Sequence, residues 1–176
     1  MKEIARRTRQ TLVRALVAAA IPCCAYAGSM APTSDLGPGE PGFGDGGQVA
    51  NMVQTGIGQR ATLDQQGNGN GASITQGVAG NLATAWQAGT NNSATLSQFG
   101  TGNAVSSSQS GKSNTLAVTQ NGNGNSTSAQ QSGTANSAAV QQNGNGDVAQ
   151  VKQYGAGQSI SIKQTGSGMR ASVVQR

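Results

Sequence analysis

The pattern that determines the fold is clearest in residues 92–109, NSATLSQFGTGNAVSSSQ, where Gln98 and Gln109 stand eleven positions apart. The same spacing continues in both directions without exception. The twelve members of the series are Gln54, Gln65, Gln76, Gln87, Gln98, Gln109, Gln120, Gln131, Gln142, Gln153, Gln164 and Gln175. A strict internal period of this kind indicates a repeat architecture.

Other positions keep the same register. Asparagine stands five residues after the glutamine in seven intervals, alanine is usual seven residues after it, and Leu, Ile or Val is usual nine residues after it. Alternate residues of a β-strand point the same way, so these odd offsets predict one strand face with Asn, Ala, aliphatic and Gln side chains. The asparagines of this inward face are Asn70, Asn81, Asn92, Asn103, Asn114, Asn125 and Asn136.

Glycine-rich tetrapeptides separate the predicted strands. Because glycine accepts positive φ, they are expected to form turns. Every second tetrapeptide ends in glycine, which doubles the period to 22 residues and predicts tight turns that alternate with looser connectors. The glycines of the tight turns are Gly58, Gly80, Gly102, Gly124, Gly146 and Gly168. The six repeats are 48–65, 70–87, 92–109, 114–131, 136–153 and 158–175.

A two-stranded hairpin is marginal alone, whereas stacked repeats bury a continuous core. The prediction is therefore an all-β, two-sheet β-solenoid of cross-β type, with six strand–turn–strand rungs of 22 residues about 4.8 Å apart. The inward carboxamides would be costly to bury unless each one bonds to its copy on the next rung, with its spare group reaching turn backbone. Such a ladder needs the same amide at every rung.

Both ends of this predicted solenoid matter for function. The last strand is followed only by Arg176, and no polar cap is evident at either end. Unpaired strand edges template the addition of another chain. Contact between unlike ends does not close, so the sequence predicts an open filament in which the chain is its own partner.

Composition and charge exclude several classes of function. The 176 residues include no His, six acids and 3% aromatics, with a net charge of +5. Imidazole catalysis is excluded, and paired-carboxylate catalysis is poorly supplied. The chain is not expected to be an enzyme or to carry a cofactor or metal. Five of the eleven basic residues lie in the first 27 residues, so the charge is no sign of nucleic-acid binding.

The first 27 residues have the features of a secretory signal peptide. A basic opening precedes the apolar run from Ala15 to Ile21, and Ala25 and Ala27 provide the small residues of a cleavage site. The apolar run is too short for a transmembrane anchor. Residues 28–47, rich in Gly and Pro, are expected to be a flexible leader, and residues 48–176 are the repeat domain.

Charged residues are sparse in the repeats. Arg60, Asp64, Lys152, Lys163 and Arg170 are expected on the outward face, whereas Asp147 takes an inward asparagine position. These residues either solvate the sheet or act as gatekeepers that slow premature assembly. The C-terminal bases, Arg176 included, could also anchor the chain to an acidic surface.

The motif resembles the repeat of the curlin family, the subunits of curli, which are extracellular functional amyloid fibres of bacteria. Ser93, Gln98, Gly100, Gly102 and Asn103 follow the family order, with alanine one place early at residue 104 and Gln109 closing the unit. The resemblance implies an adhesive, biofilm-forming fibre. It also implies another curlin subunit, an outer-membrane secretion pore and accessory factors as partners.

The family has a major subunit and a minor, nucleating one. The C-terminal bias of Lys152, Lys163, Arg170 and Arg176 resembles the minor type and favours it slightly, whereas the regular ladder of repeats three and four resembles the major type. One alternative is a soluble secreted β-solenoid that binds carbohydrate or ice. A β-helix enzyme is the other, and no cluster of acids or bases supports it.

Overall fold

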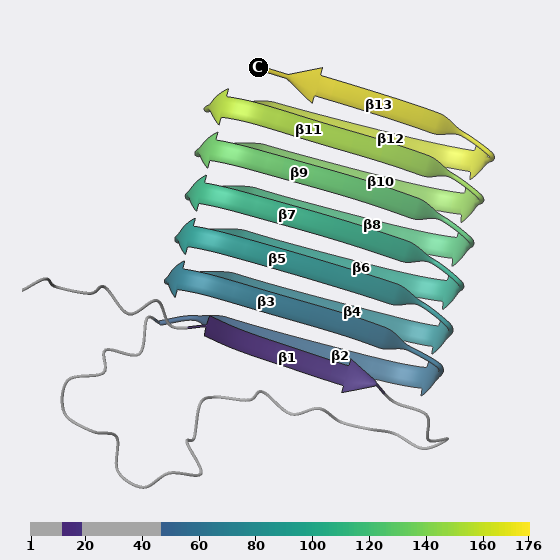
Figure 1. The fold of residues 1–176 in the computed structure, drawn as a ribbon. Coiled ribbons are helices and arrows are strands. Elements are labelled where there is room, and N and C mark those ends of the chain that lie inside the picture. The colour runs from purple at the N-terminus through teal and green to yellow at the C-terminus, as the bar shows by residue number, and fades with distance from the viewer. Residues whose placement is uncertain (1–11, 19–46) are drawn as a thin grey trace, which may run out of the picture.

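The computed structural model describes residues 12–18 and 47–176 (Figure 1). Most of the predicted signal peptide and almost all of the predicted leader lie outside the described residues. In the described part, no helix has the length and hydropathy needed to cross a membrane.

Thirteen strands make up the described structure, and twelve of them follow one another from residue 49 to residue 175. Their bounds are β1 Leu12–Ala18, β2 Val49–Ile57, β3 Arg60–Asn68, β4 Gly71–Ala79, β5 Leu82–Thr90, β6 Ser93–Thr101, β7 Ala104–Lys112, β8 Thr115–Asn123, β9 Ser126–Thr134, β10 Ser137–Asn145, β11 Val148–Ala156, β12 Ser159–Ser167 and β13 Arg170–Gln175.

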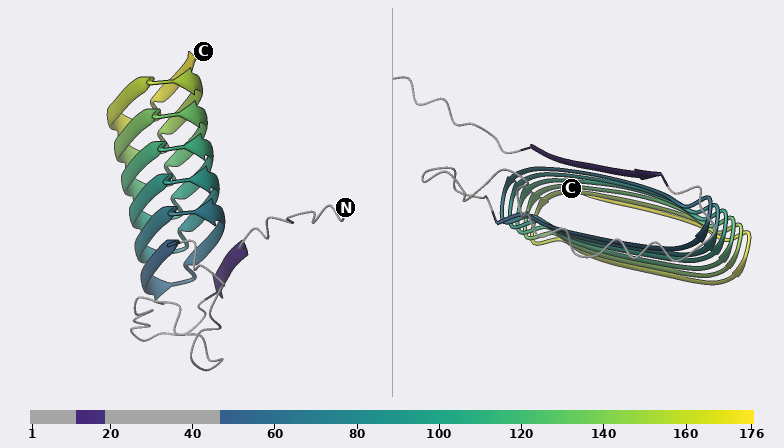
Figure 2. Two further views of the ribbon diagram at one scale, coloured as in Figure 1. Left: turned by 90° about the vertical axis from the view of Figure 1, so that its left-hand side faces the viewer. Right: turned by 90° about the horizontal axis from the view of Figure 1, so that it is seen from below.

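The strands form two parallel sheets that face each other. One sheet has the order β3-β5-β7-β9-β11-β13 and the other β2-β4-β6-β8-β10-β12, with β1 added antiparallel along β3. Each residue pairs with the residue 22 positions later, as Gln98 does with Gln120. Seen along the stack, the rungs superpose as a flattened ring (Figure 2). The predicted two-sheet solenoid of six 22-residue rungs is confirmed.

The core is one thin layer between the sheets. Its centre holds small and aliphatic side chains such as Leu63, Ile74, Leu96 and Val118, all at most 1% exposed. Inward glutamines and asparagines flank this layer and are as fully buried as the aliphatic residues. Burial alternates strictly along each strand, as the period of two requires.

The prediction of alternating tight and loose connections is wrong. Only two residues separate successive strands at every corner from Gly58 onward. At the corners without glycine, Asn91, Ser113 and Ala135 adopt φ of 55–57°, and the corner glycine Gly102 has φ of 66°. Because stacking fixes the corner geometry, both kinds of sequence take the same left-handed turn.

A second set of glycines lies inside the strands, two residues after each ladder glutamine. Their φ values lie mostly between 107° and 122°, and Val78, at φ 82°, is the exception in the series. At Gly100 an added Cβ would lie 2.0 Å from the Gly122 carbonyl oxygen of the next rung. These glycines therefore permit close backbone approach between rungs, whereas nothing lies within 4 Å of a Cβ added at Gly102.

We expect Gly100→Ala to be far more damaging than Gly102→Ala. The first change combines a glycine-only φ with a backbone clash and should lower the free energy of unfolding by more than about 3 kcal/mol. The second places alanine in the left-handed region, which costs about 1–2 kcal/mol. Denaturant unfolding of the two variants measures the difference, and equal losses would contradict the close approach at Gly100.

Candidate functional site

Two glutamine ladders run the length of the solenoid, one along each sheet. In each ladder the Nε2 of one glutamine donates to the Oε1 of the glutamine one rung later, at 2.7–3.2 Å. From Gln65 onward, the second Nε2 hydrogen goes to a backbone carbonyl on the facing sheet, as from Gln98 to Leu82 at 3.0 Å. One side chain thus joins both its neighbouring rungs and the two sheets.

The inward asparagines stand at the corners, where they bind mainly to backbone. Asn103 Nδ2 donates to the carbonyls of Phe99 and Gly122, at 3.2 and 2.8 Å. Its Oδ1 accepts the backbone N–H of Asn125 on the next rung at 3.0 Å. The amide-to-amide bonds expected for a ladder are seen between asparagines only from Asn92 to Asn70 and from Asn114 to Asn92.

The corner series is longer than the asparagines alone. Gln59, which is 3% exposed, donates to the Thr55 carbonyl and accepts the N–H of Asn81, so it acts as the asparagine of the first rung. Gln158 donates to the Tyr154 carbonyl in the same way. Sequence reasoning missed both residues, although each stands five positions after a ladder glutamine.

We expect Gln98→Ala to lower the free energy of unfolding by about 2–4 kcal/mol, because it leaves a cavity and breaks two ladder bonds. Asn103→Ala should cost a similar amount. Ser106→Ala removes an exposed hydroxyl and should change stability by less than about 0.5 kcal/mol. Both amide variants should also slow fibre assembly more than Ser106→Ala in a thioflavin time course. Equal rates for all three would contradict the inward assignment.

The predicted turn glycines all lie at corners, with φ between 60° and 68°. The charged residues are not brought together into one site. Arg60, Lys163, Arg170 and Arg176 are exposed, Asp64 and Lys152 are partly buried, and Asp147 is completely buried. No group of three or more His, Cys, Asp or Glu residues that could hold a metal ion occurs in the described segments.

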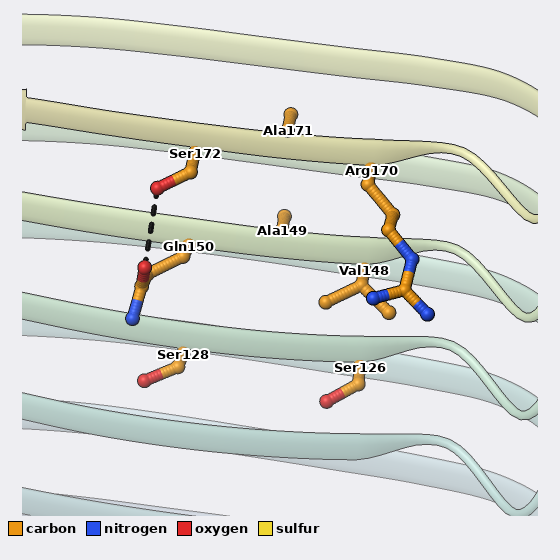
Figure 3. A pocket seen from close by; sticks show the side chains of 8 residues that line it. All are labelled: Ser126, Ser128, Val148, Ala149, Gln150, Arg170, Ala171 and Ser172. Carbon is orange, nitrogen blue, oxygen red and sulfur yellow. Dashed lines mark hydrogen bonds between the residues drawn. The ribbon is translucent and has the colours of Figure 1, made fainter.

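Arg170 lies on the outward face of the last rung and borders a shallow groove. Figure 3 shows its side chain extending over Val148 of the rung before, with Ser126 one rung further along. In the same groove, Ser172 donates to Gln150 at 3.1 Å. The groove carries one exposed cation among small polar side chains.

The two ends of the solenoid differ in their unused hydrogen-bonding groups. At the N-terminal end, the Oε1 atoms of Gln54 and Gln65 are buried and accept no hydrogen bond. At the C-terminal end, Nε2 of Gln164 donates to the Val148 carbonyl and Nε2 of Gln175 to the Ser159 carbonyl, which leaves each amide one hydrogen for a further ladder bond. Acceptors therefore face out of one end and donors out of the other.

These features define a class: a parallel two-sheet β-solenoid whose rungs are joined by continuous amide ladders. The family model of the curlin associated repeat matches residues 79–100, 89–122 and 122–155. The chain belongs to the curlin family. The rungs on either side of the matched region have the same strand register as those within it. No curated protein and no solved structure matches the chain.

Proposed function

We propose that the chain is a structural subunit of an extracellular curli fibre and assembles head to tail through the two ends of its solenoid. The observation that carries the proposal is the complementarity of those ends. Buried glutamine acceptors without a donor are costly, and the opposite end offers donors in the same ladders. The curlin repeat family is structural rather than catalytic, which fits this role.

The register of the joint follows from six rungs of 22 residues, so residue n of the next molecule takes the place of n + 132. β12 then pairs with β2, and β13 with β3. Gln164 and Gln175 donate to Gln54 and Gln65 of the next molecule. Gln158, whose Oε1 is buried without a partner, is placed to accept the backbone N–H of Gln48 of the next molecule.

This joint does not close on itself, because it uses two different surfaces on opposite ends of a straight stack (Figure 2). Heterologous contacts of that kind generate open filaments. Pairing at both strand edges continues the two sheets, the thin core and both glutamine ladders from one molecule into the next. The fibre would be cross-β along its whole length.

Export is part of the proposal. Residues 1–27 serve as a signal peptide, and the leader at 28–47 addresses the chain to the outer-membrane pore and its accessory factors, which deliver it to the cell surface. The described strand β1, Leu12–Ala18, lies within that signal segment and occupies the β3 edge that the joint needs. Removal of the segment would free this edge.

We infer that the chain is of the minor, nucleating type, acting with another curlin subunit in an adhesive biofilm matrix. The support is the placement of Lys152, Lys163, Arg170 and Arg176 toward the C-terminal end. Tethered to a surface, the chain should shorten the lag of a partner curlin from the same source. An unchanged lag would favour the major type.

The fibre itself is tested on the chain from residue 28 to residue 176. At concentrations on the order of tens of micromolar, we expect a rise in thioflavin fluorescence, fibres in electron micrographs and a reflection at about 4.7–4.8 Å. A chain that stays monomeric for days and gives no such reflection would contradict the proposal. That result would favour a soluble solenoid that binds carbohydrate or ice.

The register of the joint has a sharper test, because the chain after residue 27 contains no cysteine. In-register parallel strands place Cα atoms about 4.8 Å apart, within disulfide range. The double variant Val49→Cys/Ser159→Cys should therefore form intermolecular disulfides on oxidation of the fibres. The mismatched control Val49→Cys/Ser161→Cys should not, whereas the matched pair Asn51→Cys/Ser161→Cys should. Equal cross-linking in all three would refute the register.

A further inference from the structure

The most unusual side chain of the solenoid is Asp147, a carboxyl group at an inward corner where the preceding rungs carry asparagine. It is 0% exposed and stands between Asn125 on the rung before and Met169 on the rung after. Its backbone N–H donates to Asn125 Oδ1 at 3.0 Å, and its Oδ1 accepts the N–H of Met169 at 2.9 Å. These two bonds continue the corner series on either side.

The second carboxyl oxygen, Oδ2, is buried and has no hydrogen-bond partner. At Asn125, the group in this place is an NH2 that donates to the carbonyl four residues earlier and to the glycine carbonyl nineteen residues later. The corresponding groups for Asp147 are the carbonyls of Asn143 and Gly166. An oxygen therefore stands where the fold supplies two acceptors.

The backbone differs at the same corner. Gly144 and Gly166 have φ of 156° and 146°, whereas the other glycines of their series lie between 107° and 122°. A Cβ added at Gly144 would lie 3.1 Å from Asp147 Oδ2. The departure is confined to the two rungs that meet at Asp147.

No compensating charge faces this oxygen from the described residues packed around it. The corner segments 121–125, 143–146 and 165–169 contain no titratable side chain. The nearest cations in sequence are Arg170, exposed on the outward face, and Lys152, five residues further on. A buried carboxylate in this setting is unfavourable, and acceptors without a donor add to the cost.

We propose that Asp147 is a proton-controlled latch between the fifth and sixth rungs. A proton on Oδ2 removes the buried charge and supplies a donor to the Asn143 or Gly166 carbonyl, so the corner closes as it does at asparagine. As the pH rises and the proton is lost, docking of the sixth rung weakens. A calcium ion is disfavoured because it takes six to eight oxygen ligands, and this corner offers one carboxylate and two carbonyls.

The latch bears on assembly because the sixth rung, β12 and β13, forms the C-terminal end of the joint. This consequence rests on the proposed function. Under acidic conditions the end that receives the next molecule is complete. Toward neutral pH it opens more often, and elongation from that end slows.

The latch is tested by backbone hydrogen exchange of the full chain at about pH 4 and about pH 7, corrected for intrinsic rates. The readout is the protection of segment 165–171 relative to the internal segment 121–127. In the wild type this ratio should fall at least about tenfold at the higher pH. Asp147→Asn should hold it at the acidic value throughout.

Two further variants control for charge and position. Asn125→Asp creates a second inward carboxyl one rung earlier and should bring the same pH dependence to the amide of residue 147. Asn145→Asp places a carboxyl on the exposed strand end next to this corner and should add none. A wild-type ratio independent of pH, or an Asp147→Asn ratio that still falls, overturns the latch.

Calcium added at about pH 7 is the last arm. No change in protection supports the proton, whereas recovery to the acidic value overturns it in favour of a metal site. The exchange ratio is read on the solenoid itself, so it does not depend on fibres. A pH-dependent ratio in a chain that never forms fibres would retain the latch and refute the proposed function.

Discussion

The structure depends on one constraint: a carboxamide buried in a thin core must find hydrogen-bond partners on the rungs above and below it. Gln98 meets this constraint through Gln76, Gln120 and the facing sheet. Only an identical side chain in the same register can repeat the arrangement. The central positions have no such requirement, and residues 63, 85 and 107 are Leu, Ala and Ser in one column.

The same constraint gives the solenoid a direction. Every ladder bond runs from an Nε2 to the Oε1 of a later rung, so the first rung is left with acceptors and the last with donors. Strand edges alone would permit several modes of association. Amide polarity together with the 22-residue register selects one of them. Asp147 shows the sensitivity of this order, because replacing one amide nitrogen by oxygen leaves a buried atom without a partner.

The sequence was sufficient to predict the period, the inward face, the number of rungs and the parallel stacking. These features follow from spacing and alternation, and residues such as Gln98 and Leu96 carry the signal directly. The corners were harder to predict because their conformation is imposed by neighbouring rungs. Asn91, Ser113 and Ala135 have little in common as side chains, yet they share one backbone conformation. The role of Gly100 was also hidden, since it depends on the position of a carbonyl 22 residues away.

The uniform register makes the number of rungs in a chain independent of the surfaces at its ends. Removing or duplicating one 22-residue unit in the middle would leave the first and last rungs unchanged, together with all groups that meet at a joint. Chains of different length can then enter the same filament. Duplication of whole units would be a simple evolutionary route to longer subunits, whereas a single-residue insertion within a strand would reverse the inward and outward faces of the residues that follow it.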